Sequence, residues 1–241
     1  MEVIILTDLT QYAVEDMIDK MYTAARCCYN PGTCVELITD AQNTKTTEDK
    51  IKLIQKVLDS GHQSIAEHVS ITFCIDGISR SASHQLVRHR LCTYSQQSQR
   101  YCDLSKNKID WIIPDSIRKD EYAMAAYNEA LRAIEKAYCY CVDVGIKAED
   151  ARYILPNACP TNIVVTTNLR NLFHVMGLRC CNRAQWEIRA VFKELSAKLC
   201  AAIPFLAKYF KANCDQWGFC PEGRPCGKTP TLKQILENKP E

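Results

Sequence analysis

The sequence predicts one globular domain of mixed α and β structure in which helix outweighs strand. The chain has 241 residues, of which 47% are hydrophobic and 24% charged, and these fractions are close to the averages of soluble globular domains. Apolar residues recur at helical spacing in several segments and alternate with period two in one. No internal repeat or Gly/Ser-rich linker divides the chain. We therefore expect a single domain over residues 1–241, with an irregular tail at about 213–241.

The residues up to Gly61 predict a strand followed by helices. Val3–Leu6 is a short apolar run typical of a buried strand. Asp8 or Thr10 is a suitable N-cap for the helix that follows. Thr46, with an acidic residue three positions later, predicts a second helix cap, and Gly61 is the expected stop of that helix.

The segment His68–Ile75 is the clearest strand. Its apolar residues alternate with polar ones, so one face is expected to be buried and the other to carry His68 and Ser70. The alternation alone favours a solvated or structural histidine over one that lines a site. A helix is expected from Ser79 to about Arg90, followed by a polar loop over 93–100.

The second half of the chain is predicted to be mostly helical. The longest helix is expected over 120–144, with Tyr122 and Tyr138 on its apolar side. The other expected elements are, in order, a helical turn over 150–155, a strand over 163–166, a helix capped by Asn168 and ending at Arg179, and a helix over 186–199 capped by Asn182 and interrupted at Pro204.

Charge and cysteine content limit the partners and the compartment. The formal charge of +2 provides no strong field for nucleic acid or an anionic membrane, and no apolar stretch approaches the length of a transmembrane span. The fifteen cysteines are an odd number in a chain long enough to form its own core, and the first residues lack the features of a signal peptide. We expect a cytoplasmic protein that binds neither nucleic acid nor membrane.

The cysteines of the tail raise the question of a metal. Cys214, Cys220 and Cys226 are spaced unlike the tight pairs of common zinc sites. We therefore expect thiols in a loose extension and no metal, although a zinc-stabilised interaction protein remains an alternative.

The densest group of functional side chains lies between Gln85 and Tyr101. It contains three arginines, a histidine and many hydroxyl and amide groups, a composition suited to phosphates and heterocycle carbonyls. Gln85 and Arg88 would share one face of the expected helix. A solvated helix end is the structural alternative, and a nucleotide- or RNA-binding regulatory module using the Arg88–Arg100 patch is the functional one. The chain contains no glycine-rich phosphate or dinucleotide loop.

Three blocks of sequence resemble a known family. The central block is Arg88-His89-Arg90, seven further residues, Ser98, and then Arg100-Tyr101. It is preceded by Gly61-His62-Gln63-Ser64 with Glu67-His68, and followed by Asn168-Leu169-Arg170-Asn171-Leu172, Gly177-Leu178-Arg179 and Arg183-Ala184-Gln185-Trp186-Glu187-Ile188-Arg189. In this order the blocks resemble the flavin-dependent thymidylate synthase (ThyX) family.

The resemblance implies a fold, a reaction and an assembly. The family transfers a methylene unit from methylenetetrahydrofolate to C5 of dUMP, with FAD as the hydride carrier and NADPH as its reductant. It is an α+β homotetramer with a mostly antiparallel sheet flanked by long helices, and its active sites are shared between subunits. Because the flavin performs the redox chemistry, none of the cysteines needs to be catalytic.

The resemblance also assigns roles to individual residues. The dUMP-binding residues it implies are Gln85, Arg88, Gln97, Ser98, Gln99, Arg100, Arg152 and Arg179. Among these, Arg179 is expected to lie against the uracil ring and to act catalytically, because a fixed cation favours the enolate-like form that attacks through C5.

The same resemblance implies a set of FAD-binding residues, and here His68 takes a ligand-binding role. The residues are His68, Ser70, Arg88, His89, Arg90, Gln96, Asn168, Arg170 and His174. Two positions depart from relatives: Gln96 replaces a common glutamate and His174 replaces an asparagine. The roles of these two side chains are therefore the least defined.

Overall fold

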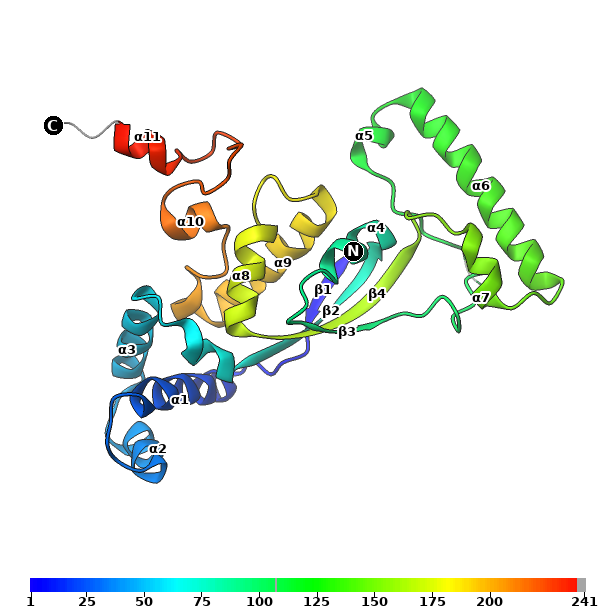
Figure 1. Ribbon diagram of the computed structural model, residues 1–241. Helices are drawn as coiled ribbons and strands as arrows, with labels where there is room; N and C mark the ends of the chain where they lie inside the picture. The colour runs from blue at the N-terminus through cyan, green and yellow to red at the C-terminus, as the bar shows by residue number, and fades with distance from the viewer. Residues whose placement is uncertain (107, 238–241) are drawn as a thin grey trace. The chain divides into compact units, whose positions relative to one another are not determined.

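A computed structural model describes residues 1–106 and 108–237 of the chain (Figure 1). The strands of this described part are β1 (Glu2–Ile5), β2 (Ser70–Ser79), β3 (Thr93–Gln96) and β4 (Pro160–Asn168). The α-helices are α1 (Gln11–Cys27), α2 (Cys34–Asn43), α3 (Thr47–Asp59), α4 (Arg80–Leu86), α5 (Asp115–Arg118), α6 (Glu121–Asp143), α7 (Ala148–Ala151), α8 (Leu169–Arg179), α9 (Trp186–Ala202), α10 (Asn213–Trp217) and α11 (Leu232–Glu237). Three 3-10 helices are η1 (Gln63–His68), η2 (Arg152–Ile154) and η3 (Pro204–Leu206).

The described strands form one antiparallel sheet in the order β1-β2-β4-β3. The period-two pattern of β2 is confirmed, since Ile71, Phe73 and Ile75 are fully buried while Ser70 is exposed. Together with the dominant helix content, the sheet confirms the α+β class expected from the sequence.

The chain folds as two compact units. The first contains Met1–Glu2, Cys74–Arg88 and Tyr94–Val165, and therefore α4 to α7. The second contains Val3–Phe73, His89–Thr93 and the chain from Thr166 onward, and therefore α1 to α3 and α8 to α11.

Helices α1 and α3 of the second unit form where their caps predict them. The hydroxyl of Thr10 accepts a hydrogen bond from the Ala13 amide at the start of α1, and Thr46 accepts one from the Asp49 amide at the start of α3. Both bonds satisfy amides that lack a partner within the helix. The helices α1 and α3 pack together (Figure 1), and Met21 of α1 and Ile54 of α3 are fully buried.

Helix α8 is also predicted well and carries several site residues. The Asn168 side chain caps it by accepting the Asn171 amide at 2.9 Å, and Arg179 is its last residue. Gly177 lets α10 approach closely, because a Cβ added there would lie 1.9 Å from Oδ1 of Asn213. The position and the length of α8 are therefore fixed by its cap and by the packing of its last turn.

Two predicted elements around the central block, residues 88–101, are wrong in their bounds. The expected helix over 79–90 ends at Leu86, because the Tyr94 hydroxyl donates to the Leu86 carbonyl at 2.7 Å and the chain turns into β3. The expected polar loop therefore contains a short strand. The strand expected from His68 begins only at Ser70, since His68 is the last residue of η1.

The C-terminal part differs from its prediction in two ways. The cap of α9 is Gln185 rather than Asn182: the Gln185 side chain accepts both the Glu187 and the Ile188 amides at 3.0 Å. The tail expected to be irregular contains α10 and α11, which short-range periodicity did not reveal. Residues 238–241 of the expected tail lie outside the described residues.

Helix α6 follows its predicted bounds, with Asp120 as N-cap and Val144 as C-cap. Tyr138 is fully buried and its hydroxyl accepts the Leu104 amide at 3.2 Å. Tyr122, expected on the same apolar side, is 88% exposed. Periodicity places a residue on a face, but burial also needs a neighbouring element to cover it. In the described residues no helix has the length and apolar character needed to cross a membrane.

We predict that Tyr138→Ala will lower the free energy of unfolding by about 3–5 kcal/mol, the usual cost of removing a buried aromatic ring. Tyr122→Ala, on the same helix, should change it by less than about 0.5 kcal/mol. Urea unfolding followed by circular dichroism measures both values. Equal effects of the two substitutions would contradict the burial of Tyr138.

Candidate functional site

The residues expected to bind dUMP and FAD fall into two sets, each within one compact unit. The first unit contains Gln85, Arg88, Gln96, Gln97, Ser98, Gln99, Arg100 and Arg152. The second unit contains His68, Ser70, His89, Arg90, Asn168, Arg170, His174 and Arg179. Each set is described by itself below.

In the first unit, Gln96 at the end of β3 is held by two hydroxyl groups. Its Nε2 donates to Oγ of Ser83 at 2.9 Å and to Oγ1 of Thr161 at 3.3 Å. The next amide, that of Gln97, donates to the Asn162 carbonyl at 2.9 Å. The loop that begins at Gln97, after β3, is therefore fixed at its start against α4 and β4.

An arginine that the sequence had not indicated shares a hydroxyl partner with this glutamine and lies near Arg152. Arg80, the first residue of α4, is half-buried and donates to Oγ1 of Thr161 at 3.4 Å. Burial lowers the pKa of Arg80, and the nearby charge of Arg152 lowers it further. In the described part of the chain neither guanidinium forms an ion pair with a carboxylate. Two neighbouring cations without an acid between them favour a bound anion.

Arg80 was missed because the resemblance assigned no role to this position. The available signal was its position directly after the Ser79 cap, where the strand enters α4.

Arg100, near the end of the central block, has an acidic partner. Its Nε and NH2 atoms lie 3.0 and 2.9 Å from Oε2 of Glu149, and its guanidinium stacks 5.4 Å from the Tyr101 ring centre. The Glu149 carbonyl accepts Nε of Arg152 at 3.0 Å. The central block itself contains no acidic residue, so the pairing of Arg100 with Glu149 depends on the tertiary structure.

The remaining residues of the first set are arranged along the same loop. Nε2 of Gln99 donates to Sγ of the buried Cys159 at 3.2 Å, and Oγ of Ser98 accepts the Arg100 amide at 3.2 Å. Gln85 lies on α4, but Arg88 lies in the exposed turn after the helix has ended. The expectation that these two share one helix face is therefore wrong.

In the second unit, the facing ends of β2 and β4 bring four predicted residues together. The Leu169 amide donates to the Val69 carbonyl at 2.8 Å, which places Asn168 and Arg170 beside His68 and Ser70. Arg170 also forms an ion pair with Glu67. The Glu67 side chain, quoted in the resemblance without a role, therefore orients one of the expected FAD contacts.

The contact that joins two distant sequence blocks is a hydrogen bond between Arg179 and His89. Nε of Arg179 donates to Nε2 of His89 at 2.8 Å. Burial, followed by the charges of Arg179 and His174, lowers the pKa of His89 from 6.5 to about 4. At neutral pH the imidazole is therefore uncharged and its Nε2 can accept, with its proton on Nδ1.

A second contact fixes the turn that carries His89. Nδ2 of Asn171 on α8 donates to Sγ of Cys92 at 3.1 Å and to Oγ1 of Thr167 at 2.8 Å. The turn over 89–93 is thus attached to α8 at two places. His174 and Arg90 are exposed, so both are accessible to a ligand.

His68 also lines a pocket of about 540 Å³ whose other residues come from α1 and α2. Its lining residues are Asp16, Asp19, Lys20, Thr23, Ala24, Cys27, Cys28, Ile38, Ala41, Gln42 and His68. The volume is in the range of cofactor and ligand pockets. The alternating pattern alone favoured a solvated or structural role for His68. In the structure this side chain contributes to a concave surface.

Comparison with known proteins identifies the family. The family described as thymidylate synthase complementing protein matches residues 8–205. The chain belongs to this family. It is also similar to the flavin-dependent thymidylate synthase of Geobacter sulfurreducens, with 43% identity over 214 residues, covering 88% of this chain and 90% of that protein.

Two further relatives carry the same name. The Clostridium tetani protein is 40% identical over 230 residues, with 88% of this chain and 90% of the relative covered. The Pyrococcus abyssi protein is 43% identical over 185 residues, covering 74% and 76% respectively. The expectation drawn from the three sequence blocks is confirmed at the level of the family.

The lowered pKa of His89 predicts a specific pH dependence of stability. Between pH 6.5 and about 4 the unfolded chain binds a proton at this residue that the folded chain does not bind. The contribution of His89 to the free energy of unfolding is therefore constant above pH 6.5 and falls as the pH decreases toward 4. Urea unfolding at several pH values should show this loss.

The substitution His89→Gln removes the titrating group and should flatten that part of the profile. His84→Gln, at an exposed position on α4, is the matched control and should leave the profile unchanged. A wild-type profile that His89→Gln does not alter would contradict a neutral, half-buried His89.

Proposed function

We propose that the protein is a flavin-dependent thymidylate synthase that converts dUMP to dTMP with methylenetetrahydrofolate as the carbon donor. The observation that carries the proposal is the extent of the family match, because residues 8–205 include every residue assigned to the two sets. No observation favours the nucleotide- or RNA-binding regulatory module that the Arg88–Arg100 patch left open.

The second unit provides groups that suit FAD. Arg170 and Arg90 supply positive charge for a pyrophosphate, Ser70 and Asn168 supply hydroxyl and amide groups for ribose and ring edges, and the pocket beside His68 has the size of a heterocycle site. Bound FAD would carry the hydride, and NADPH would reduce it. The protein's own contribution is to hold and orient the reactants.

The first unit provides groups that suit the nucleotide substrate. Arg80 and Arg152 are neighbouring cations, and Gln97, Ser98 and Gln99 add amide and hydroxyl groups along the adjoining loop. We assign the phosphate of dUMP to the arginine pair, because a dianion offsets the repulsion between two guanidinium groups. Gln85, Arg88 and Arg100 complete the proposed nucleotide set.

Arg179 is assigned to the uracil ring. Its hydrogen bond to the neutral His89 fixes the orientation of the guanidinium. A cation fixed in this way stabilises negative charge that develops on a uracil carbonyl as C5 attacks the methylene group. His89 then acts as a positioning residue for Arg179.

The proposed assembly is a homotetramer whose active sites combine residues of more than one subunit. The proposed location of the protein is the cytoplasm. The exposure of Arg88, Arg90 and His174 in the single chain leaves these residues available to a ligand or to a second subunit. Light scattering of the purified protein tests the assembly.

We predict that Arg179→Ala will reduce kcat/KM for dTMP formation by about 100-fold or more, the usual cost of removing a group that stabilises developing charge. The assay contains dUMP, methylenetetrahydrofolate, FAD and NADPH and measures dTMP. Arg179→Lys keeps the charge but not the Nε donor to His89, so it should recover only part of the activity. Full activity of Arg179→Ala in a folded protein would contradict the assignment.

A separate prediction concerns the phosphate. Arg80→Met should raise the KM for dUMP by about 10-fold to 100-fold, in line with the loss of one hydrogen bond to a charged group. Arg118→Met removes an exposed arginine of the same unit and should leave the KM unchanged. If Arg80→Met lowers kcat with no change in KM, Arg80 does not bind the phosphate.

A further inference from the structure

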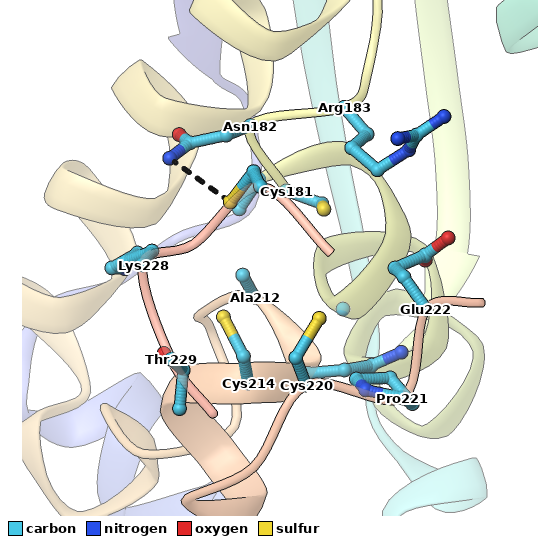
Figure 2. A pocket seen from close by; sticks show the side chains of 14 residues that line it. Cys181, Asn182, Arg183, Ala212, Cys214, Cys220, Pro221, Glu222, Lys228 and Thr229 are labelled. Atoms are coloured by element: carbon cyan, nitrogen blue, oxygen red, sulfur yellow. Dashed lines mark hydrogen bonds between the residues drawn. The ribbon is translucent and has the colours of Figure 1, made fainter. Parts of the chain in front are cut away.

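Five cysteines line one small pocket at the C-terminal end of α8. They are Cys180, Cys181, Cys214, Cys220 and Cys226, and all are free thiols. They come from the loop between α8 and α9, from α10 and from the tail, and Figure 2 shows the sulfur atoms of Cys214 and Cys220 turned into the same space. The proposed reaction uses none of these thiols.

The tail segment that carries Cys226 lies directly along the loop that carries Cys181. Nδ2 of Asn182 contacts Sγ of Cys226 at 3.8 Å (Figure 2), and NH1 of Arg183 donates to the Arg224 carbonyl at 2.7 Å. Two successive loop residues thus bind two nearby tail residues. Cys181, the neighbour of Asn182, lines the same pocket as Cys226.

The thiols of the pocket differ in reactivity. A backbone hydrogen bond from Lys228 lowers the pKa of the exposed Cys226, and the Asn182 contact and the Lys228 charge act in the same direction. Lys228 is itself held by both oxygens of Asp215, at 2.6 and 2.8 Å. Burial instead raises the pKa of Cys180 to about 12. Because the thiolate is the nucleophile, Cys226 is the reactive member and Cys180 is inert.

Among the described residues no group of three or more His, Cys, Asp or Glu side chains is arranged to hold a metal ion. The lowered pKa of Cys226 and the free thiols that line the same pocket favour thiol chemistry.

We propose that Cys226 and Cys181 form a thiol–disulfide exchange site that joins the tail to the loop after α8 when a small disulfide compound is present. The Cys226 thiolate attacks one sulfur of glutathione disulfide, which forms a mixed disulfide and releases one glutathione thiolate. The Cys181 thiolate then attacks Sγ of Cys226 and displaces the second glutathione. Two protein thiols are oxidised, one disulfide is reduced to two thiols, and the protons of the protein thiols pass to the released thiolates.

The site would affect the segment next to the proposed uracil contact. Cys180 and Cys181 directly follow Arg179, the last residue of α8. A bond from Cys181 to the tail would thus restrain the chain immediately after that arginine.

The test uses the full chain, purified with a reductant, freed of it, and incubated with glutathione disulfide. After alkylation and digestion, mass spectrometry should identify a peptide linked through Cys181 and Cys226, with two of the fifteen thiols lost. The rate of alkylation of Cys226 in the untreated protein should exceed that of Cys34, an exposed cysteine on α2, by about 10-fold or more.

Two variants separate the steps. Cys226→Ser should abolish both the link and the glutathione adduct of the tail, whereas Cys181→Ser should stop the reaction at a stable adduct on Cys226. Cys34→Ser is the control and should form the link normally. A link between other cysteines, equal alkylation rates at Cys226 and Cys34, or about one zinc ion per chain whose removal is needed before Cys226 reacts would each overturn the proposal.

Discussion

The hydrogen bond between Arg179 and His89 is the constraint on which the arrangement of the second unit depends. It joins residues that are 90 positions apart in the chain and fixes the orientation of the guanidinium. The bond requires an uncharged imidazole, because a protonated histidine has no acceptor at Nε2 and would repel the arginine. Burial keeps His89 neutral over the physiological pH range. The desolvation of His89 therefore determines the orientation of the positively charged Arg179 side chain.

Helix α8 fixes the spacing between two groups of residues that we propose bind the ligands. Asn168 and Arg170 are at its start and Arg179 is at its end. The helix has 11 residues, so its ends are separated by about 16 Å. Its N-terminal end is attached to the start of β2 through the Leu169 amide, and its last turn is packed under α10 at Gly177. The helix thus holds both groups of residues without relying on flexible loops.

The first unit uses a different principle, the accumulation of positive charge that the protein does not fully neutralise. Glu149 compensates Arg100, while Arg80 and Arg152 remain close together among hydroxyl and amide groups. A site of this kind is costly for the protein alone and becomes favourable with an anion. The phosphate binding that we propose therefore relies on the positive charge that the chain leaves uncompensated.

The sequence by itself determined the helices with strong caps, the buried face of β2 and the family. Asp120, Thr46 and Asn168 cap their helices through bonds to residues three positions away, and such local interactions are readable from sequence. Only the tertiary structure decided that His68 ends a 3-10 helix, that Glu149 pairs with Arg100, that Arg80 joins the cationic pair and that His89 meets Arg179. Each of these depends on burial or on contact between segments far apart in the chain, and residue spacing carries no information about either.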